Sequence, residues 1–318
     1  MKTPLRYPGG KSRAVKHILP HIPDCVELCS PFLGGGSLEL AIAARGTKVY
    51  GYDDFEPLIW FWKALLESPK ELADEADELR VEKCGPHNER GLPKKNFKDL
   101  RDALRGQTTF SLENAASFYA INRSSFSGAT FSGGWSKKAS YARFTDSSIK
   151  RIKDFKEPNL VVEHADFKDS ILRHPDVFLY LDPPYMLPER EREKLYGDKG
   201  NKHKDFDHEG LFELLKERSN WVLSYSGDVA TIKEMYKGSD IIDMSGKWSY
   251  GMKNISRPEH GYCNIMLQLL EKNKEKFKTV KGRYDKYYED EVRRMKKTLK
   301  DLKKKMDKSS EILIKSKG

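Results

Sequence analysis

Apolar and polar positions in the first part of the chain predict a strand, a turn, a helix and a second strand. The run CVELCSPF (residues 25–32) is short and apolar, as is typical of a buried strand, and three glycines follow it at positions 34–36. The stretch LELAIAARG (38–46) then has the spacing of a helix, and KVYGYDD (48–54) has that of a strand. This order predicts the first unit of a doubly wound α/β sheet.

The pattern changes to amphipathic helices between residues 60 and 158. Helical periodicity runs through SPKELADEADELR (68–80), NFKDLRDALRG (96–106) and SLENAASFYAINR (111–123), and a loop rich in Gly, Ser and aromatic residues follows at 124–144. We therefore predict a helical subdomain, residues 60–158, that is inserted into a sheet domain. The sheet domain should comprise residues 1–59 and 159–271.

Strand and helix patterns alternate again after residue 158. The expected strands are 159–167, 177–185, 221–227, 240–246 and 262–270, and the expected helices are 208–218 and 229–238. Between Leu187 and Asp207 the chain is charged, contains glycine and has few apolar residues, so we expect a mobile loop there.

The last segment, residues 272–318, is predicted to be a basic helical tail. Its apolar residues recur at alternating spacings of four and three, a heptad pattern that allows a homodimer through a coiled coil: Tyr288, Val292, Met295, Leu299, Leu302 and Met306. Residues 271–318 hold 18 Lys and Arg against 9 Asp and Glu, which is most of the net charge of +10. Such a segment attracts a polyanion such as nucleic acid, although a solvated lysine-rich helix is an equally plain reading. We expect that removal of residues 272–318 weakens binding to nucleic acid and flattens its salt dependence while the ligand pocket stays intact.

Composition narrows the class of protein. The chain has 318 residues, of which 38% are hydrophobic and 33% charged, a balance typical of a globular protein. The first residues, MKTPLRYPGGK, contain no apolar signal region, and no apolar run approaches the roughly 18 residues of a membrane span. Four cysteines are too few for a disulfide framework. We therefore expect a cytoplasmic protein.

A metal site is not expected. His17, His21, Cys25 and Cys29 recur every four residues, which would align four ligands on one helix. Pro20 and the predicted strand at 25–32 interrupt any such helix, so these side chains should not converge.

The glycine turn at 34–36 predicts a cofactor that contains adenosine. Glycine allows the backbone to pass close to a ligand, and Asp53 ends the next strand about twenty residues later, where an acidic group commonly accepts ribose hydroxyls. The turn matches neither the G-x-G-x-x-G pattern nor a P-loop, so the cofactor need not carry a diphosphate, and S-adenosylmethionine fits better than NAD. An ordinary tight turn and a helix cap at Asp53 are the structural alternative.

The sequence DPPY (182–185) follows a predicted buried strand. Proline cannot extend a sheet, so Asp182, Pro183, Pro184 and Tyr185 should lie at the carboxyl end of that strand, where α/β sheets bind ligands. A carboxylate, a rigid carbonyl and an aromatic side chain suit a ligand such as an aminopurine base, whose amine is conjugated to its ring. Hydrogen bonds from the amine to Asp182 and to the Pro183 carbonyl would favour a pyramidal nitrogen, which can attack a methyl carbon. The Tyr185 ring can stack on the base.

Four motifs occur together in this order: LRYPGGK (5–11), PFLGGGSLEL (31–40), YDD (52–54) and DPPY (182–185). In this order the chain resembles the alpha group of the Dam-like family of DNA adenine N6-methyltransferases, over most of residues 4–270. The resemblance implies a Rossmann-like S-adenosylmethionine-dependent methyltransferase sheet with an inserted target-recognition subdomain. It also implies site-specific methyl transfer to N6 of an adenine that is flipped out of double-stranded DNA.

The resemblance assigns roles to individual residues. Tyr7 and Lys11 would contact S-adenosylmethionine, with Lys11 near its carboxylate or the catalytic strand ends, Asp53 would bind the ribose hydroxyls, and Asp166 would bind the adenine of the cofactor. The complete set implied for the cofactor is Tyr7, Lys11, Phe32, Gly34, Gly36, Asp53, Asp166 and Asp182. Residues Asp182 to Tyr185 would hold the target base. The segment INRSSFSG (121–128) follows the family pattern only loosely, and the basic tail has no counterpart in it.

The insertion offers side chains that suit DNA. Arg123, Lys137, Lys138 and Arg143 alternate with aromatic residues, a mixture suited to phosphate contacts and base stacking. We predict that this segment recognises the target, while a small satellite core with a solvated rim is the structural alternative.

Other functions stay open at this stage. The acceptor could be N4 of cytosine or an RNA base, although Asp182 favours adenine, and a non-catalytic DNA-binding protein is a rival of another class. An NAD-dependent oxidoreductase is disfavoured because the glycine pattern is missing and DPPY would have no use. A restriction-modification partner, replication control and phage defence are equally compatible settings, in a bacterium or a phage.

Overall fold

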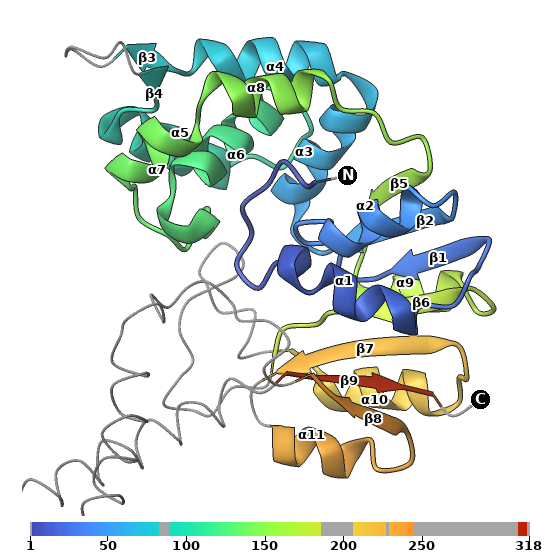
Figure 1. Ribbon diagram of the computed structural model, residues 1–318. Coiled ribbons are helices and arrows are strands. Elements are labelled where there is room, and N and C mark those ends of the chain that lie inside the picture. The colour runs from blue at the N-terminus through green and yellow to red at the C-terminus, as the bar shows by residue number, and fades with distance from the viewer. Residues whose placement is uncertain (1, 83–89, 186–205, 227–228, 245–310, 317–318) are drawn as a thin grey trace, which may run out of the picture. The chain divides into compact units, whose positions relative to one another are not determined.

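The computed structural model describes residues 2–82, 90–185, 206–226, 229–244 and 311–316. These residues form a seven-stranded sheet flanked by helices, with a group of further helices in the upper part of the view in Figure 1. The strand order is β5-β2-β1-β6-β7-β9-β8, and the pairs are parallel except that β9 is antiparallel to both of its neighbours. The strands of this sheet are β1 Glu27–Ser30, β2 Lys48–Asp53, β5 Leu160–His164, β6 Phe178–Leu181, β7 Trp221–Ser226, β8 Asp240–Asp243 and β9 Glu311–Lys315.

The topology places a switch point between β1 and β6. From β1 the chain proceeds to β2 and β5 on one side, and then returns to β6 and β7 on the other. Loops that follow such a pair of strands diverge and leave a crevice at their carboxyl ends, where ligands of open α/β sheets bind. The alternation predicted from the sequence is thus confirmed for the six strands β1, β2 and β5 to β8.

The two faces of the sheet are covered by different helices because side chains alternate along each strand. In β6, Tyr180 belongs to one hydrophobic core and Leu179 and Leu181 to the other. The first core contains residues of α1 Val15–Ile18, α2 Ser37–Ala43 and α3 Glu56–Glu67, and the 3₁₀ turns η1 Lys11–Arg13 and η2 Leu19–His21 flank α1. The second core contains residues of α9 Phe167–Arg173, α10 His208–Lys216 and α11 Val229–Met235.

The helical insertion between β2 and β5 is built around α6. This helix contacts α3, α4, α5 and α7, and nine of its residues are buried. The elements of the insertion are α4 Pro69–Glu78, β3 Val81–Glu82, β4 Arg90–Gly91, α5 Lys94–Arg105, α6 Leu112–Ser124, η3 Phe126–Gly128, α7 Lys137–Arg143 and α8 Asp146–Lys153. The segment 124–144, predicted to be a loop, therefore includes a short helix.

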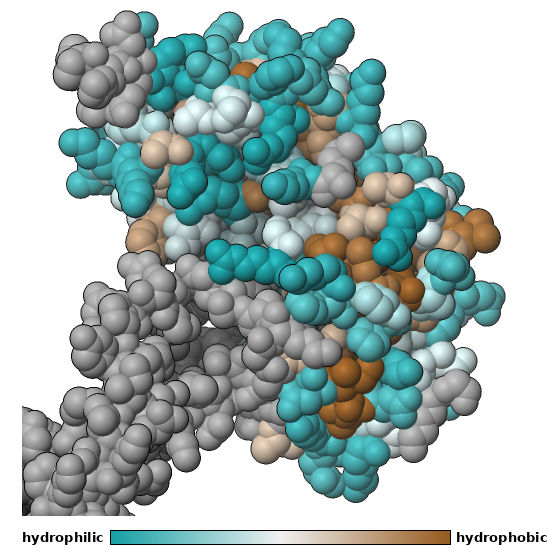
Figure 2. Space-filling model, in the orientation of Figure 1, coloured by the Kyte–Doolittle hydropathy of each residue, from teal (hydrophilic) through white to brown (hydrophobic). Residues whose placement is uncertain are grey.

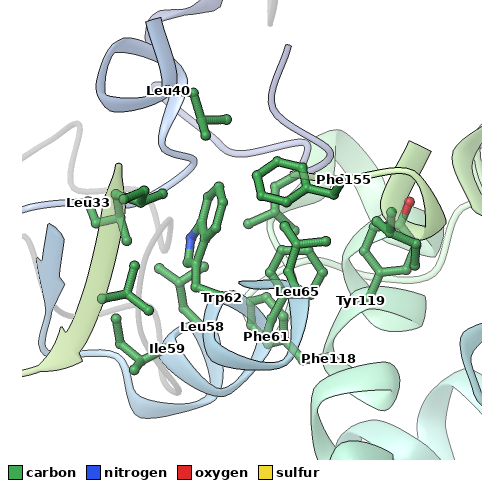
Figure 3. Close-up of a cluster of buried hydrophobic side chains, with 14 of the residues drawn as sticks. Leu33, Leu40, Leu58, Ile59, Phe61, Trp62, Leu65, Phe118, Tyr119 and Phe155 are labelled. Atoms are coloured by element: carbon green, nitrogen blue, oxygen red, sulfur yellow. The ribbon is translucent and has the colours of Figure 1, made fainter. Parts of the chain in front are cut away.

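The insertion and the sheet share one core. Figure 3 shows this core around α3, from Leu33 and Leu40 near the sheet to Phe118 and Tyr119 of α6. The rings of Phe61 and Tyr119 stack at 5.4 Å, and Trp62 Nε1 donates a hydrogen bond to the Gly34 carbonyl at 3.0 Å. The domain boundary predicted at residue 60 thus falls inside a helix that is buried on both sides.

The C-terminal strand β9 differs from the sequence-based prediction. Residues 272–318 were expected to be a basic tail, yet β9 lies between β7 and β8, with Leu313 opposite Ser224 of β7 and Ile242 of β8. The side chains of Ile312, Leu313 and Ile314 are at most 1% exposed. The prediction of a tail is therefore wrong for residues 311–315, which belong to the sheet. The loop predicted up to Asp207 is described only at its end, and the strand predicted at 262–270 and the heptad segment 288–306 lie outside the described residues.

Two sequence-level points concern the N-terminal part and the membrane. Helix α1 ends at Ile18 and η2 ends at His21, before β1 begins at Glu27, so no continuous helix carries the four His and Cys residues, as predicted. Within the ranges described, no helix is long and apolar enough to cross a bilayer.

Candidate active site

A cavity of about 530 Å³ opens at the carboxyl ends of β1, β2, β5 and β6. Its lining comes from the segments that leave these strands, from the N-terminal loop (residues 2–10) with Lys11, and from the start of α10. The principal lining segments are 7–11, 31–37, 53–55, 166–168, 182–185 and 206–207. The cavity thus occupies the switch point of the sheet, where the sequence motifs were expected to meet.

Glycine is required in the turn that follows β1 (residues 34–36). Gly34 and Gly36 have φ angles of +47° and +62°, which side chains other than glycine rarely adopt. A Cβ atom on Gly36 would also lie 2.6 Å from the ring of Trp62, and one on Gly35 would lie 2.8 Å from Cβ of Tyr7. We expected these glycines to give room to a ligand, whereas here it is protein side chains that approach them. Trp62 and Tyr7 pack against the glycine turn and hold it in place.

Asp53 ties this turn to the end of β2. Its Oδ2 atom accepts a hydrogen bond from the Gly34 backbone N–H at 2.9 Å, and Oδ1 accepts one from the Phe55 N–H at 3.0 Å. A carboxylate has about four lone-pair sites, and Asp53 lines the cavity. This arrangement suits a ligand that carries neighbouring hydroxyl groups.

Three phenylalanines form an aromatic cluster at the cavity. The ring of Phe206 lies 5.6 Å from Phe32 and 5.1 Å from Phe167, and Phe32 stacks on Phe167 at 5.7 Å. Beside them Asp166 caps α9, because its side chain accepts a hydrogen bond from the Lys168 N–H at 2.8 Å. A flat heterocycle with an amino group would find apolar faces and a carboxylate here.

Asp182 is held by Lys11 at the end of β6. The Lys11 ammonium donates to Oδ1 and Oδ2 of Asp182 at 2.5 and 2.6 Å and to the Tyr185 hydroxyl at 2.5 Å. Tyr185 in turn donates to Asp182 Oδ1 at 3.0 Å, and Lys11 is only 4% exposed. Lys11, at the start of η1, therefore fixes both the acid and the aromatic residue of the DPPY motif, while Asp182 and Tyr185 still line the cavity.

Glu39 is a cavity residue that the sequence analysis missed. It lies on α2, is 3% exposed, and accepts a hydrogen bond from Ser30 Oγ at 2.8 Å. Burial raises the pKa of Glu39 from 4.5 to about 7. The only signal in the sequence is a single acid within the apolar run LELAIA (residues 38–43).

The raised pKa of Glu39 makes stability depend on pH. The folded state holds the Glu39 proton more tightly than the unfolded state does. Protonated Glu39 therefore adds to the free energy of unfolding below the unfolded pKa of 4.5, and this stabilisation is lost as the pH rises through about 7. We expect Glu39→Gln to raise the free energy of unfolding at about pH 8, by up to roughly 3 kcal/mol, and to have little effect at about pH 5. Urea unfolding at both pH values measures this, with the exposed Glu217→Gln as control. An equal effect of Glu39→Gln at both pH values would contradict it.

The cavity gathers the residues predicted for the cofactor and the base. All of them line it: Tyr7, Lys11, Phe32, Gly34, Gly36, Asp53, Asp166, Asp182, Pro183, Pro184 and Tyr185. Lys11 lies at the catalytic strand end, one of the two positions expected for it. Phe167 and Phe206 were not predicted, since single aromatic residues in helix starts carry no distinctive pattern.

Arg123 has a different environment from the one predicted. It is 7% exposed, and its guanidinium donates to the carbonyl oxygens of Arg143 (3.0 Å) and Pro4 (3.3 Å). The neighbouring Asn122 accepts from the Arg6 N–H at 3.1 Å and donates to the Arg6 carbonyl at 2.7 Å. These two residues of α6 hold the N-terminal loop against the insertion, so Arg123 is a structural residue rather than a DNA contact. Lys137, Lys138 and Arg143 are exposed, as expected.

Comparisons with known proteins agree with this geometry. Residues 7–250 match the sequence profile of the D12 class N6 adenine-specific DNA methyltransferases. Two relatives named DNA adenine methylase, from an Ogawa and an El Tor Inaba strain of Vibrio cholerae serotype O1, are each 26% identical to this chain over 249 residues. The aligned part covers 74% of this chain and 85% of each relative.

Proposed function

The chain belongs to the D12 class N6 adenine-specific DNA methyltransferase family, and from this premise we propose that its cavity holds S-adenosylmethionine beside a flipped-out target adenine. The protein transfers a methyl group to N6 of adenine at specific sites in DNA. The observation that carries the proposal is that Asp182 and Tyr185 open into the same cavity as the glycine turn, Asp53 and the aromatic cluster. The methyl donor and the target adenine can therefore lie side by side.

The residues of the cavity fit S-adenosylmethionine. The carboxylate of Asp53, already oriented by two backbone N–H groups, would accept the ribose hydroxyls. The aromatic cluster of Phe32, Phe167 and Phe206 would offer an apolar surface to the adenine, and Asp166 would accept a hydrogen bond from its amino group. When bound, the cofactor supplies an electrophilic methyl carbon on a sulfonium centre.

The DPPY residues would bind and orient the target base. Asp182 and the Pro183 carbonyl would accept the two N–H bonds of the adenine amino group, which localises the nitrogen lone pair toward the methyl carbon. Tyr185 would stack on the base. Lys11 keeps Asp182 in place and the two prolines keep the carbonyl in place, so these acceptors require little reorganisation during the reaction. The amino nitrogen would release one proton on methylation, and Asp182, which accepts that N–H, is placed to take it.

The insertion, residues 60–158, would provide target recognition. Three cations that the sequence analysis singled out remain exposed on or beside α7, namely Lys137, Lys138 and Arg143. On the face shown in Figure 2, hydrophilic residues predominate over the helices of the insertion. These cations would bind phosphates, which fixes the register of the protein on the duplex and helps to compensate for base flipping.

Transfer of an isotopically labelled methyl group tests the proposal. DNA is incubated with the protein and with S-adenosylmethionine that carries a labelled methyl group. The DNA is then digested to nucleosides, which are separated and identified by mass spectrometry. We expect the label in N6-methyladenine and none in DNA incubated without protein. The same assay is run with RNA, and label only in N4-methylcytosine, or only in the RNA, would overturn the assignment of the acceptor. Binding of S-adenosylhomocysteine, measured by calorimetry, tests the cofactor independently of turnover.

A further inference from the structure

The catalytic Tyr185 lies against a second tyrosine. The ring centroid of Tyr225 is 5.6 Å from that of Tyr185, with 46° between the ring planes. Tyr225 belongs to β7, the parallel neighbour of β6, two residues beyond the last β6–β7 pair, Leu181–Leu223. It is 1% exposed, so its ring is part of the packed interior directly behind the DPPY motif.

The hydroxyl of Tyr225 is paired with His208. The distance from the hydroxyl oxygen to Nδ1 of His208 is 2.5 Å, and the two rings meet edge to face at 5.8 Å. A buried tyrosine hydroxyl needs a hydrogen-bond partner, and a phenylalanine would fill this position without that requirement. The pairing therefore anchors the hydroxyl end of the Tyr225 ring, in addition to the packing around it.

His208 is itself anchored. It is the first residue of α10, whose cap Asp207 accepts a hydrogen bond from the Gly210 N–H at 2.8 Å. The second oxygen of Asp207 is 2.7 Å from Nζ of Lys168 on α9. The ring of His208 also lies 4.8 Å from Phe206, a member of the aromatic cluster at the cavity. A continuous row of rings thus connects the proposed cofactor site to Tyr185.

We propose that Tyr225, held by His208, is a positioning residue that sets the plane of Tyr185 for stacking on the target adenine. This inference rests on the proposed function, in which Tyr185 stacks on that base. The hydroxyl end of Tyr185 is fixed by Lys11 and Asp182, and Tyr225 fixes its ring. Without the His208 contact the hydroxyl end of the Tyr225 ring can shift, and the surface on which the Tyr185 ring packs is no longer defined. Capture of the flipped base weakens as a result, while cofactor binding is unaffected.

The test compares three single variants of the full-length protein and the double variant Tyr225→Phe/His208→Phe. Tyr225→Phe and His208→Phe remove the hydrogen bond, whereas His208→Asn keeps a polar atom close to the position of Nδ1. The readouts are kcat, KM for DNA, the affinity for S-adenosylhomocysteine, and the fluorescence of 2-aminopurine placed at the methylated position, which reports flipping and stacking. Tyr236→Phe is the matched control, because Tyr236 is another buried tyrosine of the same core, 3% exposed and packed on Phe212 and Trp221.

We expect Tyr225→Phe and His208→Phe to lower kcat/KM for DNA roughly 10-fold and to change the 2-aminopurine signal, with unchanged cofactor affinity. The double variant should be no worse than either single one, since both remove the same bond. His208→Asn should recover most of the loss, and Tyr236→Phe should match the parent. Thermal unfolding checks that each variant is folded.

Two results overturn the inference. One is a Tyr225→Phe protein with the kinetics and fluorescence of the parent, and the other is a His208→Asn protein as impaired as His208→Phe. Neither result affects the proposed function, which fails only if the parent protein places no labelled methyl group on adenine.

Discussion

Asp182→Asn should lower the rate of adenine methylation by a factor of roughly 10²–10³ while DNA binding persists. Asparagine keeps the shape of the side chain but replaces one acceptor oxygen with an NH₂ donor. In the parent both carboxylate oxygens lie within 2.6 Å of the Lys11 ammonium, so an NH₂ group there would face another donor. With its remaining oxygen turned to Lys11, the asparagine would present its NH₂ group to the target amine, which then lacks this acceptor. Single-turnover methylation measures the rate, and a filter or anisotropy assay measures DNA binding.

Asparagine is a sharper test than alanine at this position. Lys11 is 4% exposed, and removal of its partner would leave a buried charge unpaired and destabilise the fold. Asp169→Asn, an exposed acid on α9, is the matched control and should retain the parent rate. An Asp182→Asn protein that methylates at more than about a tenth of the parent rate would show that the carboxylate is not the main acceptor of the target amine.

Deletion of residues 311–318 should prevent folding of the sheet domain. The strand buries Ile312, Leu313 and Ile314, and each aliphatic side chain contributes about 1.5–3 kcal/mol when it is buried. The sum is comparable to the whole stability of a typical domain, about 5–15 kcal/mol. The deletion also leaves β7 and β8 without the strand that pairs both of them. Circular dichroism and soluble yield report the loss.

A milder variant makes the same point quantitatively. Leu313→Ala should lower the free energy of unfolding by about 2–5 kcal/mol in urea. Lys315→Ala, in the same strand but with a side chain 41% exposed, should change it by less than about 0.5 kcal/mol. A protein without residues 311–318 that still binds S-adenosylhomocysteine with parent affinity would contradict the expectation that the deletion prevents folding. It would then support the separable tail predicted from the sequence.

The site was predictable because it follows from strand ends. Short apolar runs bounded by glycine, proline or aspartate identified β1, β2 and β6, and parallel strands bring their carboxyl ends to one edge of the sheet. Asp53 and Asp182 could therefore be placed near one another without any knowledge of side-chain contacts. The strand β9 could not be found this way. Its three apolar residues follow a lysine-rich segment, and its partner β7 lies more than eighty residues away in the sequence.

Buried elements of the insertion escaped prediction for another physical reason. Helix α3 is mostly apolar because it packs between the sheet and α6, and an apolar run cannot be assigned to a helix or a strand by its periodicity alone. Arg123 was misjudged because a charged residue is normally exposed, whereas here backbone carbonyls satisfy its guanidinium. His208 and Tyr225 meet only in three dimensions, and nothing in the spacing of the two residues indicates the pair.

If the insertion recognises the target as we propose, the attachment of the N-terminal loop to α6 has a consequence for engineering new sequence specificity. Asn122 and Arg123 grip the backbone at Arg6 and Pro4, a few residues before the lysine that orients Asp182. A chimaera that exchanges only the insertion would break this grip and misplace Lys11. The segment to be exchanged is therefore discontinuous: residues 2–11 and the insertion must both come from the same parent protein.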